Sequence, residues 1–216
     1  MGGLLAPLQQ IAETGGPVVV VLMCVAVLTL AVSLYKVWQF WMAAVGRHTA
    51  LLEAVEAWDC GNQTEAHKAL DRSRSYLAPV VGMAMSSAKE GSARLQAEAE
   101  ARFAQLESGF RFLDSVAQLA PLLGLFGTVL GMIEAFQSMQ AAGAQVDPAL
   151  LAGGIWVALL TTAVGLVVAM PTALVLSWFE QRMEAERVIA DRAILTVLHP
   201  TGAKTVDTSD MVSAHG

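Results

Sequence analysis

The sequence predicts an all-α membrane protein with three transmembrane helices and long cytoplasmic helical extensions. The first observation is composition: 55% of the residues are hydrophobic, only 15% are charged, and the mean hydropathy is +0.54, outside the usual range of soluble domains. The second is the presence of three uncharged apolar segments, residues 15–35, 115–133 and 148–179. Each meets the requirement of about 20 residues for a helix that spans the hydrocarbon.

Basic residues predict the orientation of these helices. All 13 lysines and arginines lie between Lys36 and Arg111 or between Arg182 and Lys204. Because Lys and Arg collect on the cytoplasmic side, we expect a periplasmic N-terminus and a cytoplasmic C-terminus in the inner membrane. Residues 1–18 contain no basic residue, which argues against a cleaved signal peptide. The expected order is an extracytoplasmic segment 1–16, transmembrane helix 17–42, cytoplasmic helical domain 43–112, transmembrane helix 113–140, periplasmic loop 141–149, transmembrane helix 150–179, cytoplasmic helical extension 180–199 and disordered tail 200–216.

The cytoplasmic domain is predicted to follow an interfacial collar of tryptophans, Trp38 and Trp41, and to consist of short helices. Breaks are expected at residues 60–62 and 78–79, where glycine or proline stops a helix. From residue 91 onward apolar residues recur at steps of three and four, the spacing of helices packed side by side, and we expect this helix to run straight into the second span. The stripe comprises Leu95, Ala99, Phe103, Leu106, Phe110, Leu113 and Ala117.

Charged residues add predicted ion pairs to one of these helices and a predicted N-cap to another. Glu98 with Arg102, and Glu107 with Arg111, stand four residues apart and are expected to pair on the exposed face of the helix that starts near residue 91. The third span has no breaker before its charged continuation, so one helix is expected from about Pro148 to Leu198, on the order of 75 Å long at 1.5 Å per residue. Asp147 is its predicted N-cap, with proline in the first turn.

Small side chains line one face of each of the last two spans, and such faces let helices approach closely. In the second span they are Pro121, Gly124, Thr128, Gly131 and Ala135, and in the third Gly154, Ala158, Thr162, Gly165 and Ala169. Two interpretations stay open. The stripes are packing seams between helices, or they line a pore or seat the helix of a partner.

Glu134 is the only acidic residue between Asp114 and Asp147. A carboxylate inside a membrane is costly and is therefore a functional candidate, here an acidic residue at a pore mouth. The alternative is that Glu134 lies at the outer membrane interface.

Enzymatic chemistry is the least expected function. The two cysteines and four histidines are scattered, without metal-ligand spacing, so we predict no metal, no cofactor and no catalytic residue. The segment GLFGTVLG lacks the lysine of a phosphate-binding loop. Acidic and basic residues are mixed, which points to no nucleic-acid partner.

Two segments carry a resemblance to a known family. Residues 119–136 read LAPLLGLFGTVLGMIEAF, and residues 153–174 read GGIWVALLTTAVGLVVAMPTAL. Together they closely resemble the two-part signature of the MotA/TolQ/ExbB proton-channel family. Three spans with an outer N-terminus match the ExbB/TolQ branch, whereas the MotA branch would predict four spans.

The resemblance implies a homopentameric ring in the lipid membrane, around a pore formed by the second and third spans. The pore would hold a single-span ExbD/TolR-like partner whose aspartate carries the proton, and the complex would use the proton-motive force to drive a TonB/TolA-like protein. Thr128 and Thr162 match the pore-facing threonines of the family, and Thr161 is expected beside them on the proton pathway. Gly124, Gly131, Gly154, Ala158, Gly165 and Pro171 are expected to pack the pore or the partner helix.

One residue departs from the family pattern. Val157, five residues before Thr162, stands where relatives commonly have a glutamate. We therefore expect the titrating group to belong to the partner chain. Val157 also favours two alternatives, a non-conducting membrane scaffold that assembles a partner helix and a divergent motor that drives another envelope or motility process. The transported ion, proton or sodium, is left open.

Overall fold

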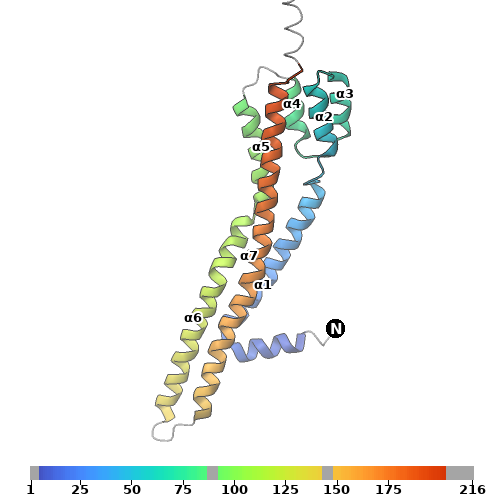
Figure 1. Cartoon of the computed structure of the whole chain (residues 1–216). Helices are drawn as coiled ribbons and strands as arrows, with labels where there is room; N and C mark the ends of the chain where they lie inside the picture. Colours follow the sequence, from blue (N-terminus) through green and yellow to red (C-terminus); the bar gives the residue numbers. More distant parts are fainter. Residues whose placement is uncertain (1–4, 87–91, 143–147, 203–216) are drawn as a thin grey trace, which may run out of the picture. The chain divides into compact units, whose positions relative to one another are not determined.

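The computed structural model describes residues 5–86, 92–142 and 148–202, and these residues form helices and connections without a strand. The helices are α1 (Leu5–Met42), α2 (Thr49–Asp59), α3 (Gln63–Arg72), α4 (Ala78–Ser86), α5 (Ser92–Glu107), α6 (Phe110–Ala142) and α7 (Pro148–Leu198) (Figure 1). Helices over Gly16–Met42, Phe110–Ala141 and Leu151–Leu198 are long and apolar enough to cross a membrane. The described residues confirm the prediction of an all-α chain, and three of their helices are candidates for the predicted spans.

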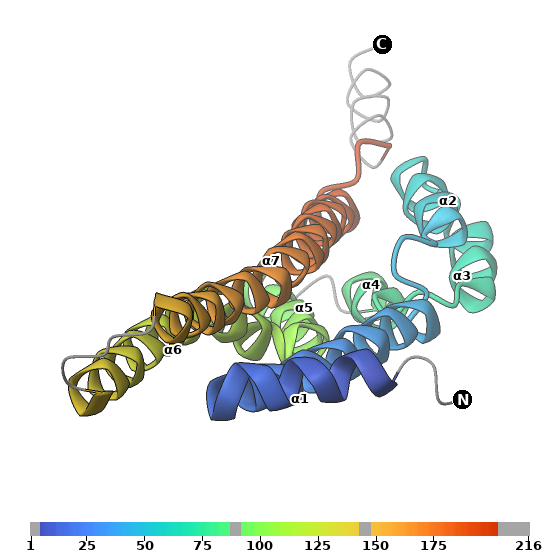
Figure 2. The same ribbon diagram turned by 90° about the horizontal axis from the view of Figure 1, so that it is seen from below.

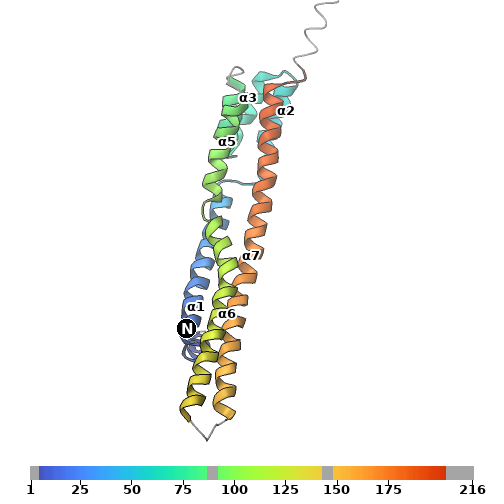
Figure 3. The ribbon, with the colours of Figure 1, turned by 90° about the vertical axis from the view of Figure 1, so that its left-hand side faces the viewer.

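The chain forms two compact units. The first comprises Met1–Leu34 and Gly109–Trp178, and the second Tyr35–Ser108 and Phe179–Gly216. In the first unit α6 and the neighbouring part of α7 lie side by side in opposite directions (Figures 1 and 3). Its buried core comprises Leu22, Val116, Ala120, Val168 and Ala169.

In the second unit α2 and α3 lie beside each other (Figure 2). Phe40 and Phe179 pack edge to face there, with ring centroids 5.1 Å apart. Aromatic pairs favour this geometry because the positive edge of one ring meets the negative face of the other. The contact joins the end of α1 to α7.

Glycines shape the connections in both units. Helical geometry in α1 is interrupted at Gly16, whose φ of 68° lies in the left-handed region that only glycine enters without strain. The predicted break at residues 60–62 is confirmed: α2 ends at Asp59, and the Asn62 side chain accepts a hydrogen bond from the backbone N–H of Glu65 at the start of α3. The second predicted break is displaced. The chain leaves α3 at Arg72, and Pro79 stands in the first turn of α4, where its missing N–H costs nothing.

The predicted continuous helix from residue 91 into the second span is wrong. The last residue of α5 is Glu107, α6 begins at Phe110, and Gly109 between them has a φ of 93°. The buried ammonium of Lys36 donates to the carbonyl oxygen of Leu106 at 3.0 Å and to the hydroxyl of Ser108 at 3.2 Å. The lysine thereby satisfies a carbonyl that the end of α5 leaves without an intrahelical donor.

The break also changes one predicted ion pair. Glu98 and Arg102 pair within α5 as predicted. Glu107 pairs instead with Arg187 of α7, at 2.7 Å, because the interruption at Gly109 separates Glu107 from Arg111. The predicted apolar stripe is buried from Leu95 to Leu113 and half-buried at Ala117.

The predicted helix from Pro148 to Leu198 is confirmed as α7, which runs unbroken for 51 residues and contributes to both units. Pro171 lies within it. Asp147, the predicted cap, and residues 203–216 of the predicted tail lie outside the described residues.

Candidate functional site

The two small-residue stripes face each other in the first unit. A methyl group added at Gly124 would lie 3.0 Å from the Thr162 Cα atom, and one added at Gly165 would lie 2.6 Å from the carbonyl oxygen of Ala120. Only glycine allows backbones to come this close. The predicted packing residues Gly124, Gly131, Gly154, Ala158 and Gly165 all make such contacts between α6 and α7. Within one chain these contacts form a seam, which we call the α6–α7 seam.

Threonine hydroxyls in the spans follow a common pattern with one exception. Those of Thr29, Thr128, Thr161 and Thr172 each donate to a carbonyl three or four residues earlier in their own helix, at 2.6–2.7 Å. This is the usual way in which a hydroxyl satisfies itself in a membrane helix. Thr162 instead donates across the seam to the carbonyl oxygen of Gly124, at 3.3 Å.

The predicted pathway residues differ in exposure. Thr161 is 2% exposed and lies inside the seam, where its hydroxyl is also 3.2 Å from the Gly124 carbonyl oxygen. Thr128 and Thr162 are half-buried, as is Val157. The structure therefore brings Thr161 and Thr162 to one carbonyl of α6, and leaves part of the Thr162 and Thr128 side chains accessible.

Two other predicted residues lie away from the seam. Pro171 lines an open groove of about 240 Å³ between α1 and α7, together with Thr29, Ser33 and Thr172. Glu134 is exposed on α6.

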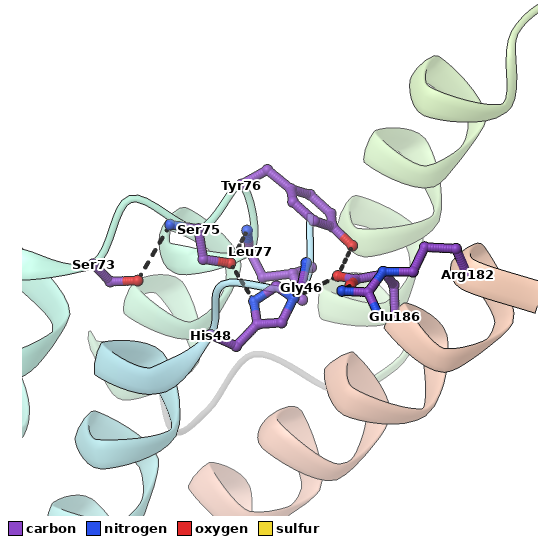
Figure 4. Close-up of polar contacts among 8 residues, drawn as sticks. All are labelled: Gly46, His48, Ser73, Ser75, Tyr76, Leu77, Arg182 and Glu186. Carbon is purple, nitrogen blue, oxygen red and sulfur yellow. Dashed lines mark hydrogen bonds and ion pairs between the residues drawn. The ribbon is translucent and has the colours of Figure 1, made fainter. Parts of the chain in front are cut away.

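A buried polar cluster in the second unit is a feature that sequence reasoning missed. Glu186 of α7 is fully buried, and its Oε2 atom accepts hydrogen bonds from His48 at 2.6 Å and from Tyr76 at 2.8 Å. The other ring nitrogen of His48 bonds the hydroxyl of Ser75 at 2.9 Å. Figure 4 shows Glu186 between His48, Tyr76 and Arg182. Burial and the hydrogen bond to Glu186 raise the pKa of Tyr76 far above its ordinary value, so the phenol stays protonated.

Gly46 lies against this cluster. Gly46 has a φ of 83°, and the guanidinium of Arg182 occupies the space that a side chain at Gly46 would fill. Arg182 also lies 3.7 Å from the Oε1 atom of Glu186.

The sequence carried one signal for this cluster. The buried face of α7 in the second unit follows steps of three and four and is apolar except at Glu186. A charged residue on an apolar stripe indicates a buried partner, because an unpaired buried charge is very costly. The residues of this face are Phe179, Met183, Glu186, Ala190, Ala193, Ile194 and Val197.

The part of the chain that contains the seam is similar in sequence to known proteins. Residues 63–191 match the MotA/TolQ/ExbB proton channel family. The sequence is 31% identical to the ExbB-like 1 protein of Synechocystis sp. over 74% of this chain and 66% of that protein. It is 36% identical to the Tol-Pal system protein TolQ of Pseudomonas aeruginosa over 48% of this chain and 45% of that protein.

The biopolymer transport protein exbB1 of Vibrio cholerae is 48% identical over 31% of this chain and 29% of that protein. The chain thus spans 29% to 66% of the length of these relatives. The matched family region covers more than half of the chain and contains the α6–α7 seam with Thr161 and Thr162. Together with the three apolar helices, this match shows that the chain is a multi-pass inner-membrane protein of the MotA/TolQ/ExbB proton channel family, in its ExbB/TolQ branch.

Proposed function

We propose that this chain is the proton-conducting subunit of an inner-membrane complex that uses the proton-motive force to energise a TonB-like or Tol-like process at the outer membrane. Five copies form a ring around the helices of a single-span ExbD/TolR-like partner, and an aspartate of that partner carries the proton. Thr128 and Thr162 line its path. A TonB/TolA-like protein receives the energy.

The observation that carries this proposal is the hydroxyl of Thr162. It is half-buried and makes a long bond to a neighbouring helix, whereas the hydroxyls of Thr29, Thr128, Thr161 and Thr172 make short bonds to their own helices. A long bond is weak, because hydroxyl-to-oxygen hydrogen bonds are commonest at about 2.7–2.8 Å. The Thr162 hydroxyl can therefore turn at low cost to solvate a proton or a neighbouring carboxyl group.

Charge supports the proposed orientation. The basic residues that flank the spans, such as Arg47 and Arg182, fall on segments that a periplasmic N-terminus places in the cytoplasm. The second unit, with its Glu186 cluster, is then the cytoplasmic part of the subunit. Glu134 belongs to the opposite end of the second span and is proposed as an acidic residue at the pore mouth.

The alternative function is a non-conducting scaffold that assembles a partner helix. Val157 favours it, because no carboxylate stands at that place in the third span. The seam favours it as well, since the glycines of α6 and α7 contact each other within one chain.

Proton flux distinguishes the two functions. The tagged chain, purified from its own host together with the proteins that copurify, is reconstituted into liposomes that contain a pH-sensitive dye, and a potassium diffusion potential is applied. We expect flux in the wild type and its loss in Thr128→Val/Thr162→Val. The matched control is Thr172→Val, which changes a back-bonded threonine of the same helix α7.

Assembly of each variant is checked by the amount of chain and partner recovered. A double variant that assembles and still conducts would reject the assigned roles of Thr128 and Thr162. A wild-type complex that assembles without conducting would favour the scaffold.

A further inference from the structure

Two successive hydroxyls of α7 approach a single carbonyl oxygen of α6. The Gly124 oxygen lies 3.2 Å from the hydroxyl of Thr161 and 3.3 Å from that of Thr162. Thr161 has a second and closer acceptor, the carbonyl oxygen of Ala158, at 2.7 Å. Since a hydroxyl carries one proton, Thr161 can direct it fully to only one of these two oxygens at a time.

This geometry gives two alternative hydrogen-bond arrangements. When Thr161 donates to Ala158, the Gly124 oxygen depends on Thr162 for its contact across the seam. When Thr161 donates to Gly124, the proton of Thr162 is no longer needed there. The second arrangement gives up the 2.7 Å bond of Thr161 to Ala158, so it is favoured only when the released Thr162 hydroxyl gains a partner in the proton path.

The side chain of Thr161 cannot itself turn toward a pore. It is 2% exposed, and a methyl group added at Gly127 would lie 2.7 Å from its Oγ1 atom and 2.8 Å from its Cβ atom. The close approach of Gly127 holds Thr161 inside the seam. Any effect of Thr161 on conduction must therefore pass through a neighbour.

We propose that Thr161 is a positioning residue for Thr162: it takes over the hydrogen bond to the Gly124 carbonyl and so releases the Thr162 hydroxyl into the proton path. The inference rests on the proposed function, since it assigns Thr162 to that path. The exchange moves one rotatable hydroxyl proton from one carbonyl to another and transfers no proton between residues. It keeps one hydroxyl hydrogen bond across the seam while Thr162 is turned away.

The test uses the same reconstituted complex with substitutions at position 161. Thr161→Val keeps the shape of the side chain and removes the donor, so Thr162 stays bound to Gly124. Because that bond is long and weak, flux is expected to fall by about threefold, the rate equivalent of the lower part of the range for one net hydrogen bond. Thr161→Ser keeps the donor and is expected to restore flux. Thr172→Val is again the matched control, and assembly is expected to be equal in all variants.

Each result bears on the inference separately from the proposed function. If the wild-type complex conducts and the Thr161→Val complex conducts equally well, the positioning role is overturned and the proposed function stands. Equal loss in Thr161→Ser and Thr161→Val would also overturn it, because a retained hydroxyl would then not restore flux and the loss would follow from altered packing. A wild-type complex without flux would overturn both.

Discussion

The Nε2 atom of His48 lies 2.6 Å from the Oε2 atom of Glu186, although the two residues are 138 positions apart in the sequence. His48 belongs to the connection between α1 and α2, and Tyr76, which bonds the same oxygen, precedes α4. One carboxylate of α7 thus holds two separate connections of the second unit. Because the Glu186 side chain is buried, the protein is expected to be sensitive to its substitution.

Replacing Glu186 with alanine is expected to lower the free energy of unfolding by about 3 kcal/mol, the order found when one partner of a buried pair is removed. The buried His48 and the half-buried Tyr76 would be left without this acceptor. Thermal and chemical unfolding of the purified chain in detergent, followed by circular dichroism, measures the change. Glu184→Ala, at an exposed position of the same helix, is the control. An equal loss in both variants would mean that the contacts of Glu186 add nothing specific.

Gly46→Ala is expected to destabilise the second unit more than Gly61→Ala. The two glycines have nearly the same backbone conformation, with φ values of 83° and 82°. A side chain in this region costs on the order of 1 kcal/mol in either case. At Gly61 the space is open, whereas at Gly46 the new methyl group would also displace the guanidinium of Arg182.

The difference between the two glycine variants, measured by the same unfolding experiments, isolates the contribution of Arg182. In an Arg182→Ala background the difference is expected to disappear. If it persisted there, Arg182 would not be its cause.

Gly165→Ala is expected to weaken the α6–α7 seam. The added methyl group would lie 2.6 Å from the backbone oxygen of Ala120, so the two helices must separate, at a cost of about 1–3 kcal/mol. Gly153→Ala is the matched control, because the space around Gly153 is open. The unfolding midpoint in detergent and the recovery of assembled complex are the measurements. Equal behaviour of the two variants would contradict close contact at Gly165.

Asp59 is expected to give an acid-dependent contribution to stability. The backbone N–H of Thr201 and then its hydroxyl donate to this carboxylate and lower its pKa in the folded state. The stabilisation is therefore present above the ordinary pKa of an aspartate and is lost as pH falls through the lowered folded pKa.

The difference in unfolding midpoint between the wild type and Asp59→Asn, followed from about pH 7 to about pH 3, measures this linkage. We expect a constant difference down to about pH 4 and a shrinking one below it. Asp71→Asn, an exposed carboxylate of α3, controls for charge. A difference that did not change over this range would refute the assigned linkage.

The spans and the seam could be predicted because their signals are periodic. Small residues at steps of three and four place Gly124 and Gly131 on one face of α6, and Ala158 and Gly165 on one face of α7. The periodicity could not decide what each face would meet. That depends on which surfaces come together in space, and within this chain the two stripes meet each other.

The break between α5 and α6 could not be found from the same kind of pattern. Leu106 and Phe110 keep a step of four across Ser108 and Gly109, so the apolar stripe continues without a change of phase although the helix stops. The left-handed conformation of Gly109 and the cap from Lys36 come from tertiary contacts that spacing does not encode. Glu186 was missed for a different reason. The sequence shows a single charge on an apolar helix face, but the partner of that charge, His48, lies 138 positions away and no local pattern connects the two residues.

The tightness of the α6–α7 seam limits where water can go. An atom added at Gly124 would lie 3.0 Å from the Cα atom of Thr162, and one added at Gly165 would lie 3.1 Å from the Cα atom of Gly124, closer than a water oxygen ordinarily approaches carbon. A hydrated wire therefore cannot thread between α6 and α7 of one chain at this level. One chain alone therefore offers no water path between these two helices. Under the proposed function, any file of waters that reaches Thr162 would have to run over the outer surface of the helix pair, along a boundary that other chains would complete.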